Sequence, residues 1–128
     1  MIKLYTDAAT RGNPGPSAAG VLVVTDTEQI QLKFPLGQMS NHEAEFAAAL
    51  IAFQQLPKYA QPNESIFFFT DSKIVDNSLT TGYAKNFQAY VDQINAIQDQ
   101  FSLVISQWLP ERDNHGAHNL ANQALHAM

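Results

Sequence analysis

Two apolar, strand-like runs in this chain end in the same way, and this repeated ending constrains the fold more than any other feature. Residues 2–5 lead into Thr6-Asp7-Ala8, and residues 66–69 lead into Thr70-Asp71-Ser72. Carboxylates at the rim of an apolar sheet are costly unless a positive charge lies among them. The pattern therefore predicts a sheet with acidic side chains gathered at one edge, where a divalent cation is the simplest partner for them.

The length and composition are typical of one globular domain. The chain has 128 residues, of which 45% are hydrophobic and 15% are charged. This is enough for one hydrophobic core and short for two. The absence of cysteine excludes disulfides, thiolate metal sites and cysteine nucleophiles. We therefore expect a single domain over residues 1–128.

Neither a targeting segment nor a membrane segment is expected from the sequence. Residues 1–7 lack the basic and then apolar pattern of a secretory signal, and the longest apolar run, residues 46–53, is too short to span a bilayer. We therefore expect a cytoplasmic protein that does not associate with membranes.

The charge argues against a general affinity for nucleic acid. The net charge is −5, and the seven basic residues are scattered along the chain without forming a run. Neutralisation of phosphates by Lys and Arg normally supplies most of that affinity. Any nucleic-acid partner must therefore be held by a local patch, by metal ions and by neutral hydrogen bonds.

The apolar periodicity and the turn residues predict three strands, a helix, a strand, two helices, a strand and a final helix. The expected strands cover residues 2–9, 18–25, 29–36, 65–69 and 103–109, and the expected helices cover residues 41–55, 72–79, 87–101 and 114–127. This order indicates an α/β fold with a mixed sheet flanked by helices. The aromatic run of residues 67–69 and the side chain of Trp108 are expected in the core.

The first helix carries a third carboxylate. It is expected to begin after Ser40, because Ser40 and Glu43 have the spacing of a capping box. Glu45 shares a helix face with Ala48, Ala49 and other small residues by the three-and-four spacing. Small residues allow that face to lie close to a sheet, so we expect Glu45 to point toward the sheet edge.

Taken together, these segments resemble type 1 ribonuclease H. They occur in the order of that family and cover nearly the whole chain: Thr6-Asp7-Ala8-Ala9, Gly12-Asn13-Pro14-Gly15-Pro16, residues 40–45, Thr70-Asp71-Ser72, residues 109–114, Ala117 and Leu120-Ala121-Asn122. The resemblance implies a ribonuclease H-like fold whose five-stranded sheet has the order 3-2-1-4-5. It also implies a metal-dependent endonuclease, in which a two-metal-type mechanism hydrolyses the RNA strand of RNA–DNA hybrids.

The same resemblance implies a metal site. Asp7, Glu45 and Asp71 would be the catalytic ligands of Mg²⁺ or Mn²⁺, with Asp7 bridging two ions. The family's fourth carboxylate, an Asp on the last helix, is replaced here by His118. Because imidazole suits transition metals better than Mg²⁺, we expect His118 to be a fourth catalytic and metal-binding residue, with a weakened second metal and a bias toward Mn²⁺.

Four further residues are implied to bind the hybrid. Asn13 and Asn41 match positions that the family uses around the minor groove of the hybrid. An amide both donates and accepts hydrogen bonds, which suits the 2′-hydroxyl that distinguishes RNA from DNA. His42 lies where many relatives have a second Asn, and Ser72 follows the third carboxylate.

Several of these residues also have purely structural interpretations. Asp71 could cap the next helix, Asn13 could only form a turn, and His118 could be a packing histidine. Glu43 is expected to be only the capping-box partner of Ser40. These alternatives stay open at the level of the sequence.

A second function fits part of the sequence. A catalytically weak or silent ribonuclease H-like domain that binds nucleic acid would explain His118, the negative charge and the absence of a Trp- and Lys-rich protrusion in residues 73–101. Three mutually repelling carboxylates count against it, because a decayed site has little reason to keep them. Arg112 and His115, in the loop before the last helix, could either of them assist product release.

Overall fold

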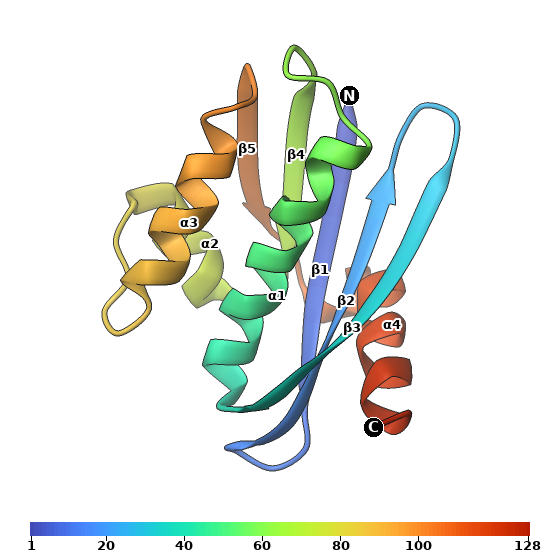
Figure 1. Ribbon diagram of the computed structural model, residues 1–128, viewed down its shortest axis with the longest axis vertical. Coiled ribbons are helices and arrows are strands. Elements are labelled where there is room, and N and C mark those ends of the chain that lie inside the picture. Colours follow the sequence, from blue (N-terminus) through green and yellow to red (C-terminus); the bar gives the residue numbers. More distant parts are fainter.

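The computed structural model describes residues 1–128 and contains a five-stranded sheet with helices on both faces (Figure 1). The strands are β1 (Ile2–Thr10), β2 (Gly15–Val24), β3 (Gln29–Met39), β4 (Ser65–Thr70) and β5 (Leu103–Trp108). The helices are α1 (Asn41–Gln55), α2 (Lys73–Thr81), α3 (Gln88–Gln98) and α4 (His115–His126), with single turns η1 (Leu56–Lys58) and η2 (Glu111–Asp113). The expected fold class and the sheet order β3-β2-β1-β4-β5 are confirmed.

The pairing of the sheet leaves an opening beside β1. Strands β1, β2 and β3 form an antiparallel meander, whereas β4 and β5 run parallel to β1. The last pair between β1 and β4 joins Thr6 to Thr70, but β1 continues to Thr10. The carboxyl half of β1 therefore has no strand neighbour on this side, and side chains from other elements can approach it there.

Helix α1 covers one face of the sheet and is buried nearly all round. It packs on β1 and β2, and α3 covers its other side (Figure 1). Small side chains such as Ala48 and Ala52 allow the close approach to the sheet, while Phe46 and Phe53 fill the space around them. Phe53 packs on Phe68 of β4, with ring centroids 4.9 Å apart. Burial of each such ring stabilises the fold by about 2 kcal/mol.

Helix α4 covers the opposite face of β1, β2 and β3. Its contact with β2 depends on Gly20, because a Cβ at this position would overlap the backbone oxygen of Ala117. Gly116 similarly allows the side chain of Leu22 to approach the helix. This close packing fixes the height of α4 above the sheet and brings His118, at the end of the first turn of the helix, beside Asp7 of β1.

The prediction that Trp108 lies in the core is wrong. Its side chain is 38% exposed, and Phe67 and Phe69 are only half-buried, whereas Phe68 is fully buried. The reason is that α4 lies over β1, β2 and β3 and leaves this face of β4 and β5 uncovered. Trp108 instead lies at the end of β5, where its Nε1 donates to the backbone oxygen of Asp71 at 3.0 Å.

The starts of α1 and α2 differ from two further expectations, which concern Glu43 and Asp71. Ser40 caps α1 as predicted, since its side chain accepts from the Glu43 backbone N–H at 3.1 Å. The carboxylate of Glu43, however, accepts from the Tyr90 hydroxyl at 2.8 Å, so it ties α1 to α3 and does more than serve the cap. The cap of α2 is Ser72 and not Asp71, which leaves the Asp71 carboxylate available for another role.

None of the helices has the length and apolar character needed to cross a bilayer.

Candidate active site

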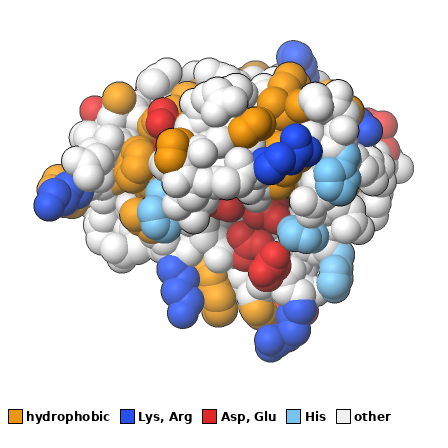
Figure 2. Space-filling view, turned by 90° about the horizontal axis from the view of Figure 1, so that it is seen from below, with side chains coloured by type: hydrophobic (Ala, Val, Ile, Leu, Met, Phe, Trp, Pro, Cys, Tyr) orange, Lys and Arg blue, Asp and Glu red, His pale blue; other side chains and the backbone are white.

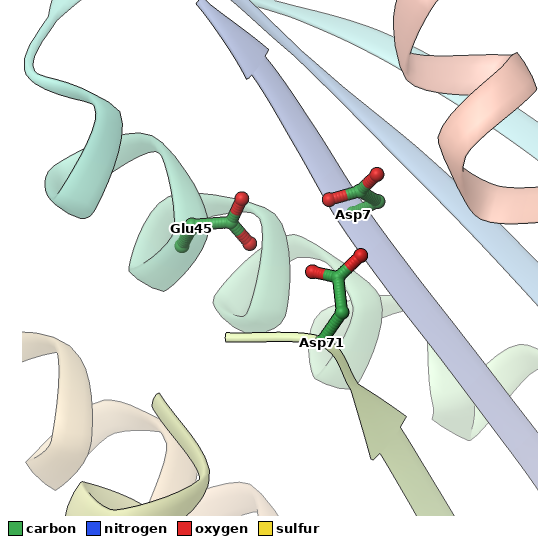
Figure 3. Close-up of side chains that lie close together, drawn as sticks. All are labelled: Asp7, Glu45 and Asp71. Atoms are coloured by element: carbon green, nitrogen blue, oxygen red, sulfur yellow. The ribbon is translucent and has the colours of Figure 1, made fainter. Parts of the chain in front are cut away.

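Three carboxylates from three different elements meet at the opening beside β1. Asp7 lies on β1, Glu45 lies in the second turn of α1, and Asp71 directly follows β4. One carboxylate oxygen of each residue lies within 4.8 Å of the other two. Figure 3 shows the three groups pointing toward one another across the gap where β4 has ended. The convergence expected from the sequence is therefore present.

The surroundings of these carboxylates disfavour their charged forms. Asp7 is only 3% exposed. Burial raises its pKa from 3.8 to about 6, and the nearby Asp71 charge contributes to the increase. Burial also raises the pKa of Glu45 well above its usual range, with Asp7 and Asp71 acting in the same direction. The pKa of Asp71 is raised mainly by burial, and a hydrogen bond from Asn114 opposes this.

This donor set fits a divalent cation. The three residues offer only carboxylate oxygens, which are the ligands that Mg²⁺ and Mn²⁺ prefer. They line a pocket of about 350 Å³. Figure 2 shows acidic side chains in a hollow of the molecular surface, with histidine and basic side chains around it. A cation bound there would favour the charged forms of the three carboxylates, against the burial and the neighbouring charges that raise their pKa values.

His118 lies beside the three carboxylates but outside the group that shares the 4.8 Å spacing. Its Nδ1 is 2.9 Å from Asp7 Oδ2, so α4 contributes a direct contact to the site. Its Nε2 is 3.0 Å from the side-chain nitrogen of Asn122, one turn further along α4. Glu111 Oε1 lies 3.5 Å from the same Nδ1, on the rim of the pocket.

Asn114 also lies at the site, although no role was predicted for it from the sequence. It is 1% exposed, and its Nδ2 donates to the backbone oxygen of Thr6 at 2.8 Å and to Asp71 Oδ2 at 3.4 Å. The motif around residues 109–114 contains this residue, but its partners are more than 40 positions away in the chain. No local signal predicts such a contact.

The residues expected to bind a substrate lie around the same opening. Asn13 and Asn41 are exposed neighbours, because the Asn41 backbone N–H donates to Asn13 Oδ1 at 3.0 Å. Asn41, His42 and Ser72 line a second pocket of about 420 Å³, which Glu45 and Asp71 also line. The Ser72 hydroxyl accepts from the Val75 backbone N–H at 3.3 Å, so part of its hydrogen-bonding capacity serves the helix cap.

Of three further cationic or titratable residues, only Lys73 lies at this opening. Lys73 also lines the second pocket, and its Nζ lies 5.0 Å from the centre of the Trp108 ring. His115, one of the two candidates for product release, lines a separate pocket with Lys3 and Tyr5. Arg112 is exposed on η2. The structure thus brings neither loop candidate into the acidic pocket.

Comparison with known proteins agrees with this geometry. Residues 5–124 match the reverse transcriptase-like family. The chain is 40% identical over 127 residues to EbsB of Enterococcus faecalis, covering 98% of the chain and 94% of EbsB. It is also 31% identical over 88 residues to the ribonuclease H of Trichodesmium erythraeum. This match covers 69% of this chain but only 54% of that enzyme.

Solved structures give the same result. Ribonuclease H1 from Halobacterium salinarum superposes with a TM-score of 0.90 at 26% identity, covering 99% of this chain and 98% of that enzyme. LC11-RNase H1, solved in complex with an RNA/DNA hybrid, superposes with a TM-score of 0.89 at 21% identity, covering 99% and 98% of the two chains. The chain therefore belongs to the reverse transcriptase-like family and has the fold of type 1 ribonuclease H.

Proposed function

We propose that this protein is a metal-dependent endonuclease that hydrolyses the RNA strand of RNA–DNA hybrids. The observation that carries the proposal is the meeting of Asp7, Glu45 and Asp71 at one partly buried edge, in a chain of this family. Relatives named ribonuclease H and a similar structure solved with an RNA/DNA hybrid support the choice of substrate.

The proposed ligands of Mg²⁺ or Mn²⁺ are Asp7, Glu45 and Asp71. When held by these residues, a cation would supply activation of the attacking water and stabilisation of the leaving oxygen. The chain itself holds the ligands in place. The Ala8 backbone N–H donates to Asp7 Oδ1 at 2.9 Å, and Asn114 Nδ2 lies within 3.4 Å of Asp71 Oδ2. These bonds restrict the two carboxylates to one geometry before a substrate arrives.

The proposed substrate contacts are mostly hydrogen-bonding side chains. Asn41 lines the pocket that Glu45 and Asp71 also line, and Asn13 contacts Asn41; amides such as these can bond the 2′-hydroxyls of an RNA strand. His42 and Ser72 line the adjoining pocket, where Lys73 adds a positive charge. With a net charge of −5, the chain is expected to bind hybrids weakly.

A gel assay on an end-labelled hybrid tests the proposal. The wild-type protein with Mn²⁺ should shorten the RNA strand of the hybrid and leave 5′-phosphate ends, while the DNA strand and duplex RNA stay intact. Asp7→Asn should abolish cleavage, because it removes a ligand and keeps the side-chain size. Cleavage by Asp7→Asn equal to that of the wild type would assign the activity to a contaminant and overturn the proposal.

The second candidate is a hybrid-binding domain with little or no cleavage. It is favoured by the hydrogen bond that occupies Asp7 Oδ2 and by the single Lys73 cation in the adjoining pocket. The same gel distinguishes the two candidates when it is run beside a binding assay. Retarded migration of the hybrid without shortening of the RNA would select the binding domain.

A further inference from the structure

The hydrogen bonds around His118 fix which of its ring nitrogens carries the proton. Asn122 Nδ2 donates to the backbone oxygen of His118 at 3.1 Å. A carbonyl oxygen only accepts, so the Asn122 atom beside it must be the amide nitrogen and not the amide oxygen. The same nitrogen lies 3.0 Å from His118 Nε2 and donates to it. Nε2 is therefore the acceptor, and the ring proton lies on Nδ1.

The consequence concerns Asp7. With its proton on Nδ1, His118 donates to Asp7 Oδ2 at 2.9 Å. The other oxygen, Oδ1, already accepts from the Ala8 backbone N–H. Both nitrogens of the imidazole are engaged, so neither has a free lone pair for a metal ion. The Nδ1–H of His118 lies between Asp7 and α4. The resemblance to type 1 ribonuclease H places a fourth carboxylate, a ligand of the second ion, at this position of the helix.

We propose that this site holds one divalent cation, bound by Asp7, Glu45 and Asp71, and that the His118 N–H takes the place of the second. His118 is then a positioning residue that acts through Asp7, and not a metal ligand as expected from the sequence. The inference rests on the metal site of the proposed function. It differs from that function in the number of ions and in the role of α4.

The charges around the pocket agree with a single ion. A second cation beside α4 would be favoured by a carboxylate there, and the polar side chains that the helix presents to the pocket are His118 and Asn122. The one additional carboxylate that lines the pocket is Glu111, whose side chain is 72% exposed and lies 3.5 Å from His118 Nδ1. Water already stabilises the charge of an exposed carboxylate. Glu111 therefore gains less from binding a second ion than a buried carboxylate would.

Titration of the full-length protein with Mn²⁺, followed by electron paramagnetic resonance and calorimetry, tests the proposal without any substrate. We expect one Mn²⁺ per chain, a spectrum without spin coupling between ions, and no hyperfine signal from a directly coordinated ¹⁴N. His118→Asp should gain a second Mn²⁺ and show a coupled pair. Glu111→Gln should leave the wild-type count unchanged.

Two more variants separate positioning from packing. His118→Asn keeps a side-chain N–H near the place of Nδ1 and should retain Mn²⁺ affinity close to that of the wild type. His118→Ala should lose about 10-fold to 100-fold in affinity, as is usual when a group that orients a ligand is removed. Thermal unfolding in EDTA shows whether each variant is folded, and a folded His118→Asn as weak as His118→Ala would contradict the positioning role.

The remaining outcomes separate this inference from the proposed function. Two Mn²⁺ ions in the wild type, or a coordinated ¹⁴N that His118→Asn removes, would overturn the single-ion inference and leave the nuclease proposal standing. No binding of Mn²⁺ by the wild type, with Asp7→Asn giving the same result, would overturn both.

Discussion

Asn114 and Thr6 are joined by a buried hydrogen bond in which Asn114 Nδ2 donates to the Thr6 backbone oxygen at 2.8 Å. The bond links the start of α4 to the strand that carries Asp7. The same nitrogen lies 3.4 Å from Asp71 Oδ2, so one side chain connects the helix to two sides of the acidic site. The placement of His118 on α4 therefore depends on Asn114 as well as on the packing of the helix.

Replacement of Asn114 by Ala should lower the free energy of unfolding by about 1–3 kcal/mol, because it leaves the Thr6 oxygen buried without a donor. It should also weaken Mn²⁺ binding, since Asp71 loses the hydrogen bond that favours its charged form. Urea unfolding and Mn²⁺ calorimetry measure the two effects. Asn119→Ala, at an exposed position of the same helix, should stay within about 0.5 kcal/mol of the wild type. Equal stability of the two variants would show that the buried bond contributes nothing.

The free energy of unfolding of the metal-free protein, measured in EDTA, should depend on pH because of the carboxylates with raised pKa values. The pKa of Asp7 is about 6 in the folded protein against 3.8 for the ordinary group, so the folded state binds a proton more tightly than the unfolded chain does. Stability should then fall as the pH rises from about 4 to about 6 and stay low above that, with a loss of about 3 kcal/mol from Asp7 alone. Glu45 and Asp71 act in the same direction.

Urea unfolding at a series of pH values in EDTA measures this fall. Addition of Mn²⁺ at neutral pH should reverse it, because a bound cation favours the charged carboxylates and stabilises only the folded state. A metal-free stability that is constant or rises over this range of pH would contradict the raised pKa values.

Asp7→Asn should make the metal-free protein more stable while it destroys the site. A neutral amide removes the repulsion with Asp71, and its single oxygen can accept from His118 in exchange for the bond from the Ala8 backbone N–H. At neutral pH we expect an increase of about 1–3 kcal/mol in the free energy of unfolding, which corresponds to about 4 °C in Tm for each kcal/mol. The stabilisation by Mn²⁺ should disappear in this variant. Asp26→Asn, in an exposed turn, should change neither quantity.

The strands, helices and acidic site were predictable because their signals are local. Alternating apolar residues and turn residues mark the strands, and the sheet edge follows from their order. Even so, the character of a residue does not show whether a helix covers it. The sequence places Trp108 in the core, but α4 does not extend over β5, and the indole instead bonds the Asp71 backbone.

The roles that could not be predicted depend on contacts between distant segments. The capping-box spacing identifies Glu43, yet the partner of its carboxylate is Tyr90 on another helix, 47 residues away. His118 was expected at the site, but its hydrogen-bonding state depends on Asn122 and Asp7 together. Such roles follow from the relative placement of elements that are far apart in the chain, α1 with α3 and α4 with β1, which no periodicity in the sequence encodes.

Gly20→Ala tests whether the height of α4 above the sheet controls the site. An added Cβ would overlap the Ala117 backbone oxygen and lie 2.5 Å from the Ala121 backbone nitrogen and 2.9 Å from Leu120 Cβ. Backbone atoms cannot move aside locally, so the whole helix must shift, at a cost of about 1–3 kcal/mol or more in the free energy of unfolding. Because His118 moves with the helix, Mn²⁺ affinity should fall together with stability.

Gly37→Ala is the matched control for this prediction. Gly37 has a φ of +88° with no atom within 4 Å of the added Cβ, so Ala there strains only the local backbone and should cost about 1 kcal/mol. It lies on β3, away from α4's contact with Asp7, and should leave Mn²⁺ affinity unchanged. If Gly20→Ala lowered stability while Mn²⁺ affinity stayed at the wild-type value, the position of α4 would not control the metal site, and the contact between His118 and Asp7 would be incidental.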